Sequence, residues 1–219
     1  QGYSSAASDV YKRQMDNISF KQRVCQSIID QSKIYKKIFV DRQYLICSKC
    51  FKNRKYYILV ANKDNYLHLV GVHTNLTPSD FFEKCFNDTL TENDFDFSKK
   101  NQSEKSVKGS VRRKISALEN INNFFAQNLY IEEGFRKNKV SCVIATSDNK
   151  ITIGFSDGMY SRPKTLLKGN MLNMSTNQID LILSKEKKDK TFNKIEYGNE
   201  EILSYYHKDI YHLISKNLI

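Results

Sequence analysis

The sequence YYILVANKDNYLHLVGVHT, residues 56–74, contains two apolar runs on either side of a polar turn. The runs are Tyr57–Ala61 and Tyr66–Val72, and the turn between them reads Asn-Lys-Asp-Asn. Short apolar runs that flank turn-forming residues predict a β-hairpin. His68 interrupts the second run, and a titratable side chain in a half-buried strand is unusual. His68 is therefore the first candidate for chemistry, and a hydrogen-bonded structural histidine is the alternative.

The remaining pattern predicts helices first and a hairpin-built sheet afterwards, which is an α+β fold in a single domain, residues 15–219. The expected helices are 16–39, 79–87, 107–126 and 200–215. The expected strands are 42–48, 140–146, 151–155 and 178–184. We expect a mobile polar loop over 89–106, and a basic connection with a short helix over 161–170.

The first fourteen residues, QGYSSAASDVYKRQ, resemble translated sequencing-adapter read-through. We expect this leader to be non-native and disordered, with Met15 as the start of the protein. No secretory signal is visible, and no apolar run is long enough to cross a membrane. These features predict a protein without a membrane partner.

The formal net charge of the chain is +11. A basic surplus of this size favours nucleic acid as a partner, although a lysine-rich composition also arises from an AT-rich genome. The five cysteines are an odd number without framework spacing, which indicates reduced thiols in a cytoplasm. Cys47 and Cys50 form one CxxC pair, but a structural zinc site needs four ligands, so we expect no metal site and no cofactor.

Two basic clusters lie downstream of His68. The first opens the predicted helix 107–126; if Val111 faces the core, Lys108 and Arg112 share one flank, Lys114 lies on the other, and Arg113 faces water. The second cluster lies in the segment 161–170, where a threonine hydroxyl stands among cations. Its members are Arg162, Lys164, Thr165 and Lys168. A solvated basic surface is the alternative interpretation of both clusters.

The chain contains no P-loop, no GxGxxG, no GxSxG and no tight acidic cluster of the kind that holds Mg²⁺. RNA can be cut without a metal because its own 2′-OH attacks the neighbouring phosphate. Such a site needs a base with a pKa near 7 and cations for the developing charge. His68 together with arginine and lysine side chains supplies those groups.

Four segments in this order resemble a known family: YYILVANKDNYLHLVGVHTNLTPSDFFEKC, KGSVRRKI, VSCVIATSDNKITIGF and SRPKTLLKGN. They are similar to a phage-associated nuclease domain of the Barnase–EndoU–colicin–RelE-like (BECR) class, its fourth phage family. The likeness covers roughly residues 51–188. It implies N-terminal helices followed by a four-stranded or slightly larger, mostly antiparallel sheet, and metal-independent RNA cleavage by phage or mobile-element effectors.

On this chain the resemblance assigns the catalytic roles to His68, Arg112, Arg162 and Thr165, which should then converge in one cleft. The residues expected to bind RNA are Lys108, Arg113, Lys114, Lys164 and Lys168. A second histidine used in some members of the class has no clear counterpart, because His207 and His212 lie in the predicted C-terminal helix.

The first hypothesis is therefore an endoribonuclease of toxin type that acts in the cytoplasm of a bacterial host, with RNA as its partner and a cognate inhibitor protein as a second one. The alternative hypothesis is a non-catalytic nucleic-acid-binding module with the same fold. A zinc- or thiol-based interaction protein is a third.

Overall fold

The computed structural model describes residues 18–137, 139–173 and 176–218. The expected leader, residues 1–14, lies outside the described residues. The helices are α2 (Phe20–Tyr35), α3 (Asn65–Val70), α4 (Pro78–Phe86), α5 (Glu104–Leu118) and α6 (Glu200–Ile210). A π-helical turn (Lys36–Val40) continues α2, and short 3₁₀ turns lie at Glu92–Asp94 and Lys216–Leu218.

Side chains at the helix starts explain where the longer helices begin. Ser19 and Gln22 form a reciprocal capping box at α2, and Thr77 accepts a hydrogen bond from the backbone of Asp80 at α4. Ser103 and Asn199 cap α5 and α6 in the same way. Each cap satisfies a backbone N–H that has no partner within its helix.

The strands form two four-stranded sheets in which every neighbouring pair is antiparallel. The first sheet has the order β10-β9-β1-β2, with β1 (Arg42–Cys47), β2 (Tyr57–Val60), β9 (Leu181–Glu186) and β10 (Lys194–Tyr197). The second has the order β3-β6-β7-β8, with β3 (Tyr130–Glu133), β6 (Ile144–Ser147), β7 (Ile151–Phe155) and β8 (Pro163–Lys168). A two-stranded hairpin is formed by β4 (Arg136–Lys137) and β5 (Val140–Ser141).

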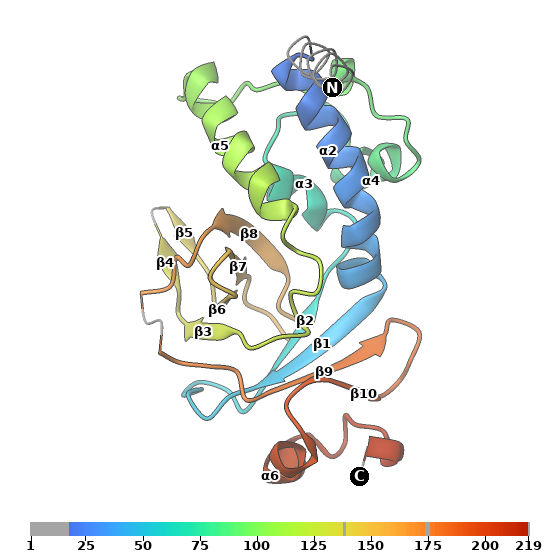
Figure 1. The fold of residues 1–219 in the computed structure, drawn as a ribbon, viewed down its shortest axis with the longest axis vertical. Helices are drawn as coiled ribbons and strands as arrows, with labels where there is room; N and C mark the ends of the chain where they lie inside the picture. The colour runs from blue at the N-terminus through green and yellow to red at the C-terminus, as the bar shows by residue number, and fades with distance from the viewer. Residues whose placement is uncertain (1–17, 138, 174–175, 219) are drawn as a thin grey trace, which may run out of the picture.

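The two sheets are joined at both ends. Ser161, just before β8, forms a parallel bridge to Leu59 of β2. Gln178, just before β9, forms an antiparallel bridge to Tyr130 of β3. All strands of the two sheets except β10, which pairs with β9 on its outer side, are therefore linked into a single closed arrangement, with α2, α4 and α5 above it and α6 below it (Figure 1).

The burial pattern of β1 shows how the layers share the core. Tyr44 and Ile46 belong to the main hydrophobic core together with residues of α2, α4 and α5. Leu45 and Cys47 point to the other face of the same sheet and pack with residues of α6. Because alternate residues of a strand face opposite sides, this central strand is buried on both faces. A third, smaller cluster lies beneath the β4–β5 hairpin, around Phe135 and Cys142.

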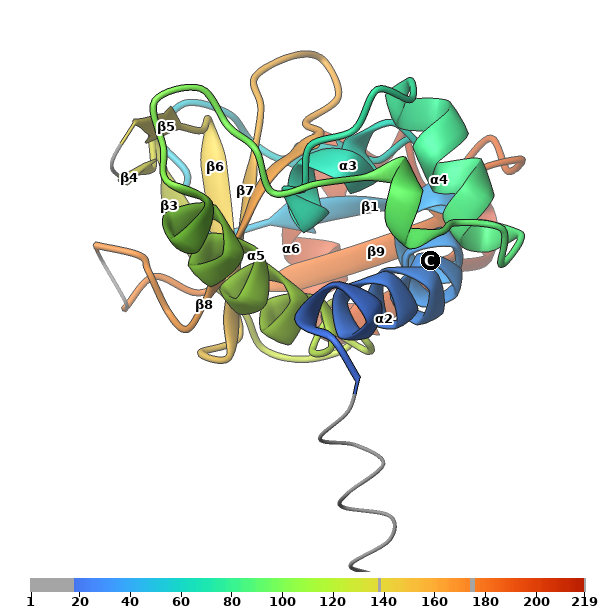
Figure 2. The same cartoon turned by 90° about the horizontal axis from the view of Figure 1, so that it is seen from above.

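The predicted hairpin over residues 57–72 is wrong in its second arm. Tyr57–Val60 is a strand, but Asn65–Val70 forms the short helix α3, which lies between α5 and α4 (Figure 2). Tyr66, Leu69 and Val70 are its buried residues, and a spacing of three and four also fits one face of a helix. An apolar run of this length is compatible with both structures.

The predicted short helix over 161–170 is also wrong, because Pro163–Lys168 is strand β8, paired with β7. Pro163 stands at its first position, beside an irregularity in the β7–β8 register, where a missing N–H costs least. The segment 89–106 is not without structure either. Phe95 and Phe97 are buried in the main core, and the Lys84 ammonium binds Asp94 at 2.6 Å.

The other expected elements are present with shifted ends. The second long helix stops at Leu118 instead of Ala126, and the last helix stops at Ile210. Val140–Ser141 separates from the predicted strand 140–146 as β5, and β9 lies three residues later than predicted at its start. The fold class is confirmed: α+β, with an N-terminal helix followed by four-stranded antiparallel sheets.

Candidate functional site

His68 lies on the exposed side of α3. A turn formed by Asn62 and Asn65 leads into this helix, in which the Asn65 side chain accepts a hydrogen bond from the Asn62 backbone N–H at 2.9 Å. Gly71 ends the helix with φ +79°, a left-handed conformation that glycine adopts without strain. With one face of α3 packed into the core, His68 is directed away from it.

Lys114 of α5 ties this histidine segment to the long helix. Its ammonium Nζ donates a hydrogen bond to the backbone carbonyl oxygen of His68. That carbonyl lies in the last turn of α3, where a cation offsets the negative end of the helix dipole. A Cβ at Gly71 would lie 2.8 Å from both Cδ and Nζ of Lys114, so a larger residue there would displace the end of this side chain from its present position.

The environment of Lys114 changes its titration. Burial and, to a smaller extent, the nearby charge of Lys99 lower the pKa of its ammonium from 10.5 to about 8. Charged lysines are disfavoured where water is excluded. Lys114 therefore differs from the other cations of α5: it was expected to bind RNA, but in the structure it contacts the backbone that carries His68.

The other flank of α5 holds Lys108 and Arg112, as the helical spacing predicted. Lys108 forms an ion pair with Glu104 at 2.6 Å and lies 5.4 Å from the ring centre of Phe97. The Arg112 guanidinium lies 5.2 Å from the ring centre of Phe20 in α2. Arg112 is thus directed toward α2, whereas Lys114 is directed toward α3.

The second basic cluster is spread over two faces of its sheet. Thr165 is buried, and its methyl group lies 2.9 Å from where a Cβ of Gly154 would stand, beside the Cys142 sulfur. Cys142 belongs to the cluster beneath the β4–β5 hairpin, whereas Leu166, the next residue, faces the main core under α5. Thr165 therefore faces the side of the sheet opposite to α3 and α5.

The basic residues of β8 lie at the surface. Arg162 and Lys168 are exposed. Lys164 is exposed too, and its Nζ donates a hydrogen bond to the backbone oxygen of Ser141 at 2.8 Å. Among the described residues, no hydrogen bond or ion pair joins any two of the four predicted catalytic side chains, which are His68, Arg112, Arg162 and Thr165. The structure instead brings together His68 and Lys114.

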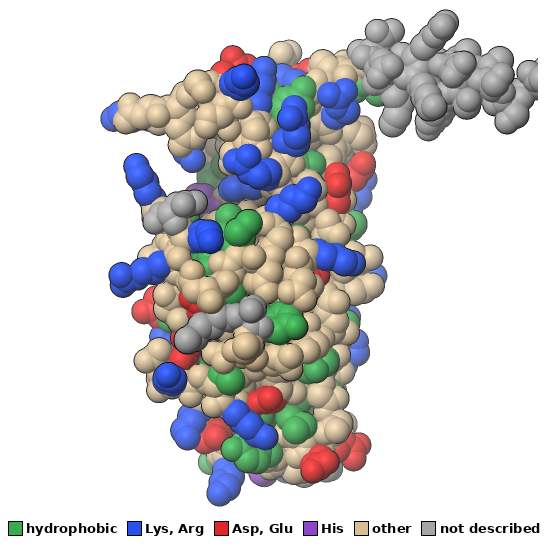
Figure 3. Space-filling view, turned by 60° about the vertical axis from the view of Figure 1, so that its left-hand side comes forward, with side chains coloured by type: hydrophobic (Ala, Val, Ile, Leu, Met, Phe, Trp, Pro, Cys, Tyr) green, Lys and Arg blue, Asp and Glu red, His purple; other side chains and the backbone are tan. Residues whose placement is uncertain are grey.

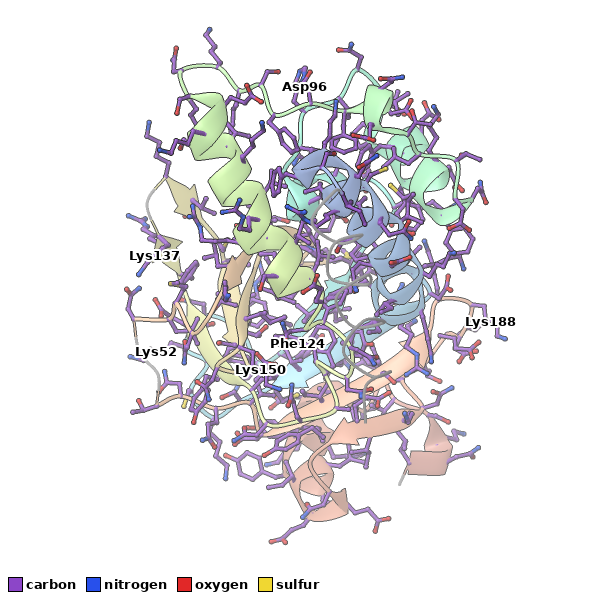
Figure 4. The ribbon with its side chains drawn as sticks, turned by 45° about the horizontal axis from the view of Figure 1, so that its top comes forward. Lys52, Asp96, Phe124, Lys137, Lys150 and Lys188 are labelled. Carbon is purple, nitrogen blue, oxygen red and sulfur yellow. The ribbon has the colours of Figure 1, made fainter. Side chains whose placement is uncertain are left out.

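Positive charge gathers on the side of the molecule formed by α5, the β4–β5 hairpin and β8, here called the basic face. In Figure 3, lysine and arginine side chains predominate over the upper half of this side, and a histidine side chain lies at the edge of a hollow among them. Exposed cations on these elements are Lys105, Arg112, Arg113, Arg136, Lys164 and Lys168. Lys137 of β4 and Lys52 project from the same edge of the molecule in Figure 4, opposite to Lys188.

The other three histidines occupy different surroundings. His73 lies 3.2 Å from a carboxylate oxygen of Asp96, at the top of the molecule in Figure 4. Hydrogen bonds from Ser98, and a smaller contribution from His73, hold the pKa of the Asp96 carboxyl below its usual range. His207 and His212 lie in or just after α6, at the opposite end of the molecule from α3 (Figure 1).

The cysteines and acidic residues offer no site of their own. All five cysteines are free thiols, and burial raises the pKa of Cys47 in the CxxC pair well above its ordinary value. Within residues 18–137, 139–173 and 176–218, there is no group of three or more His, Cys, Asp or Glu side chains arranged to hold a metal ion. No helix in the same part of the chain is long and apolar enough to cross a membrane.

Comparison with known proteins gives one match. A family model described as "phage-Barnase-EndoU-ColicinE5/D-RelE like nuclease4" matches residues 27–215, most of the chain. No curated protein matches the sequence. No solved structure matches it either. The matched range includes both sheets and the helices that carry His68 and Lys114.

Proposed function

Since the chain belongs to this phage-associated family of BECR-like nucleases, we propose that it is an endoribonuclease that cuts RNA by 2′-OH transesterification without a metal ion. The family supports a nuclease function and a nucleic acid as substrate. The observation that carries the finer proposal is the position of His68, exposed at the end of a short helix that Lys114 fastens to a basic helix.

In this reaction the 2′-oxygen forms a bond to the adjacent phosphorus while the bond from phosphorus to the 5′-oxygen breaks. His68 takes the proton of the 2′-OH as general base, which is the role for which an imidazole is suited near neutral pH. The departing 5′-oxygen takes up a proton from water, so the products are a 2′,3′-cyclic phosphate and a 5′-OH end. Because the nucleophile is already attached to the phosphate it attacks, correct positioning provides much of the acceleration.

Lys114 acts as a positioning residue in this scheme. Its hydrogen bond to the His68 carbonyl oxygen fixes the last turn of α3, and its packing over Gly71 fixes the distance between α3 and α5. The exposed cations of the basic face hold the phosphates on either side of the cut. Lys164 does so from β8, Arg162 from the position just before β8, and Arg113 from α5.

Two of the predicted catalytic residues have another role in this proposal. Arg112 lies against Phe20 on the α2 flank of α5, so it contributes to the positive field and not to the reacting phosphate. Thr165 packs beside Cys142 on the other side of the sheet, where it supports β8. The alternative proposal is a binding module with the same fold, in which the basic face binds RNA and leaves it intact.

The test is incubation of the protein with total RNA, with and without EDTA, beside a His68→Ala variant. We expect cleavage that survives EDTA, cyclic phosphate ends, and a loss of about a hundredfold or more in rate for His68→Ala. His73→Ala, in which the removed imidazole is paired with Asp96, is the matched control and should retain full activity. Cleavage that disappears in EDTA contradicts the mechanism, and full activity of His68→Ala removes His68 from it.

A further inference from the structure

The loop between β7 and β8 presents two unpartnered side chains on either side of a bridged residue. Ser161 is only 1% exposed and lies in a bridge to β2, whereas Tyr160, at the end of a bend, is 46% exposed and Arg162 is exposed. Because Tyr160 and Arg162 directly flank the inward-facing Ser161, we infer that both side chains project to the side away from it. Met159, the preceding residue, is 82% exposed.

The backbone that carries this pair is held by four hydrogen bonds. Val60 N–H donates to Ser161 O at 3.0 Å, and Ser161 N–H donates to Ile58 O at 2.9 Å. Ser156 N–H donates to Arg162 O at 2.8 Å, and Arg162 N–H donates to the Ser156 hydroxyl at 3.3 Å. The two side chains are therefore presented by a fixed backbone, and ordering them on a ligand costs little.

The tip of the loop is fixed as well. The Arg54 guanidinium donates to Asp157 at 2.7 Å and to the Gly158 carbonyl oxygen at 2.8 Å, and it lies 5.2 Å from the ring centre of Tyr57. Gly158 has φ +149°, which a residue with a side chain rarely adopts. The ion pair with Arg54 also offsets the one acidic charge of the loop, so an anionic ligand meets the positive charge of Arg162.

Neither Tyr160 nor Arg162 uses its side chain within the protein. Among the described residues, the Tyr160 ring and hydroxyl and the Arg162 guanidinium have no hydrogen bond, ion pair or ring contact. An aromatic ring beside a free guanidinium fits one chemical class well, a nucleotide whose base is unpaired. The ring stacks on the base, and the planar fork of arginine binds a phosphate.

We propose that Tyr160 and Arg162 form a base-and-phosphate clamp for single-stranded RNA, in which Tyr160 stacks on an unpaired base. The proposal rests on the proposed nuclease function only for the identity of the polymer. The strand that follows this clamp, β8, contacts α3, the helix of His68. Bases in a duplex are already stacked, so the clamp selects unpaired segments of an RNA as sites of cleavage.

The test is binding of a single-stranded oligonucleotide that is 2′-O-methylated throughout and carries a fluorescent 2-aminopurine base. This probe has no free 2′-OH, so its binding is measured whether or not the protein cleaves RNA. We expect stacking to quench the fluorescence of the wild-type complex. Tyr160→Ala should abolish the quenching and weaken binding about tenfold, while Tyr160→Phe should retain both because it keeps the ring. Tyr211→Ala, which removes a tyrosine 62% exposed beside α6, should bind like the wild type.

The variant Arg162→Ala distinguishes phosphate binding by Arg162 from base stacking by Tyr160. It should reduce the slope of log affinity against log salt concentration by about 0.7, the value for one phosphate contact to a single strand, and leave the quenching in place. Tyr160→Ala should leave this slope unchanged. Thermal unfolding of each variant establishes that it is folded.

The two proposals fail in different ways. Wild-type affinity and quenching in Tyr160→Ala overturn the clamp, even if the protein cleaves RNA. An equal loss of binding in Tyr160→Phe and Tyr160→Ala also overturns it, because the ring is then not the binding group. Quenching that depends on Tyr160 in a protein that does not cut RNA supports the clamp and contradicts the nuclease mechanism.

Discussion

The two flanks of α5 carry the same kind of charge and use it differently. On one flank, Lys108 and Arg112 lie over the rings of Phe97 and Phe20, close to water. On the other flank, Lys114 is half-buried and donates to the His68 carbonyl oxygen. The difference shows that the partner of a cation, and not its place in a basic run, decides whether it stays at the surface or fixes a neighbouring helix.

The largest loss of activity should follow from removing the hydrogen bond of Lys114. Lys114→Met keeps a long side chain but removes the hydrogen bond to the last turn of α3. If that bond positions His68, kcat for RNA cleavage should fall about 10- to 100-fold with little change in KM. Lys108→Met on the opposite flank is the matched control, and it should raise KM while kcat stays within about twofold. Equal effects of both variants on KM alone would show that Lys114 is simply another RNA-binding cation.

A second substitution tests the space beneath Lys114. Gly71→Ala places a Cβ 2.8 Å from the Lys114 side chain and also strains a backbone with φ +79°. Gly134→Ala meets similar backbone strain at φ +68°, but no atom lies within 4 Å of its Cβ. Both should lower the free energy of unfolding by about 1–2 kcal/mol, measured by urea denaturation.

Only Gly71→Ala should also lower kcat, because only this change displaces Lys114 from the His68 segment. The double variant Gly71→Ala with Lys114→Met should then lose no more activity than Lys114→Met alone. Additive losses of activity in the double variant would show that Gly71 and Lys114 act independently of each other.

The pH dependence of stability should distinguish the flanks as well. The folded state holds the Lys114 ammonium with a pKa of about 8, whereas the unfolded chain holds it near the ordinary 10.5. Between these values the unfolded state binds more protons, so the free energy of unfolding rises with pH. The gain attributable to Lys114 is at most about 1.4 kcal/mol per pH unit. Urea denaturation from pH 7 to pH 10 should show this rise in the wild type and in Lys108→Met, and a smaller one in Lys114→Met.

The smallest effect belongs to the exposed flank. Arg112→Ala removes a cation from the ring of Phe20 and should lower the free energy of unfolding by about 0.5 kcal/mol. Arg113→Ala, whose side chain is exposed on the same helix, should not change it measurably. Both should weaken RNA binding to a similar extent at low salt. If Arg112→Ala lost as much kcat as Lys114→Met, the result would indicate that Arg112 contacts the reacting phosphate, as the sequence predicted.

The sequence predicted the fold class and most of the long elements because their periodicity is unambiguous. The helix Phe20–Tyr35 and the strand Arg42–Cys47 were expected nearly as they are. The short run of residues 66–72 was misassigned because its apolar residues satisfy both a period of two and a helical spacing. What decides in favour of a helix is tertiary: α3 packs against β8, a strand that lies about a hundred residues later in the chain.

The candidate site was predicted only in part for the same reason. His68 could be selected because a histidine in an apolar run is conspicuous. The role of Lys114 could not, because it depends on a carbonyl oxygen of another helix and on the missing Cβ of Gly71. Tyr160 was missed because an exposed tyrosine has no signal in a sequence without its neighbours. Tyr160 becomes a candidate only in the structure, where the bridge that buries Ser161 leaves Tyr160 and Arg162 exposed on either side of it.

The pairing of β1 with β9 has a consequence for the synthesis of the chain. Arg42 stands opposite Glu186 in this ladder, so β1 waits for a partner strand that is synthesised long after it. Loop closure over such a separation is slow compared with the formation of local helices. During synthesis, the helices from α2 to α5 can therefore form before β9 has left the ribosome, whereas the first sheet cannot.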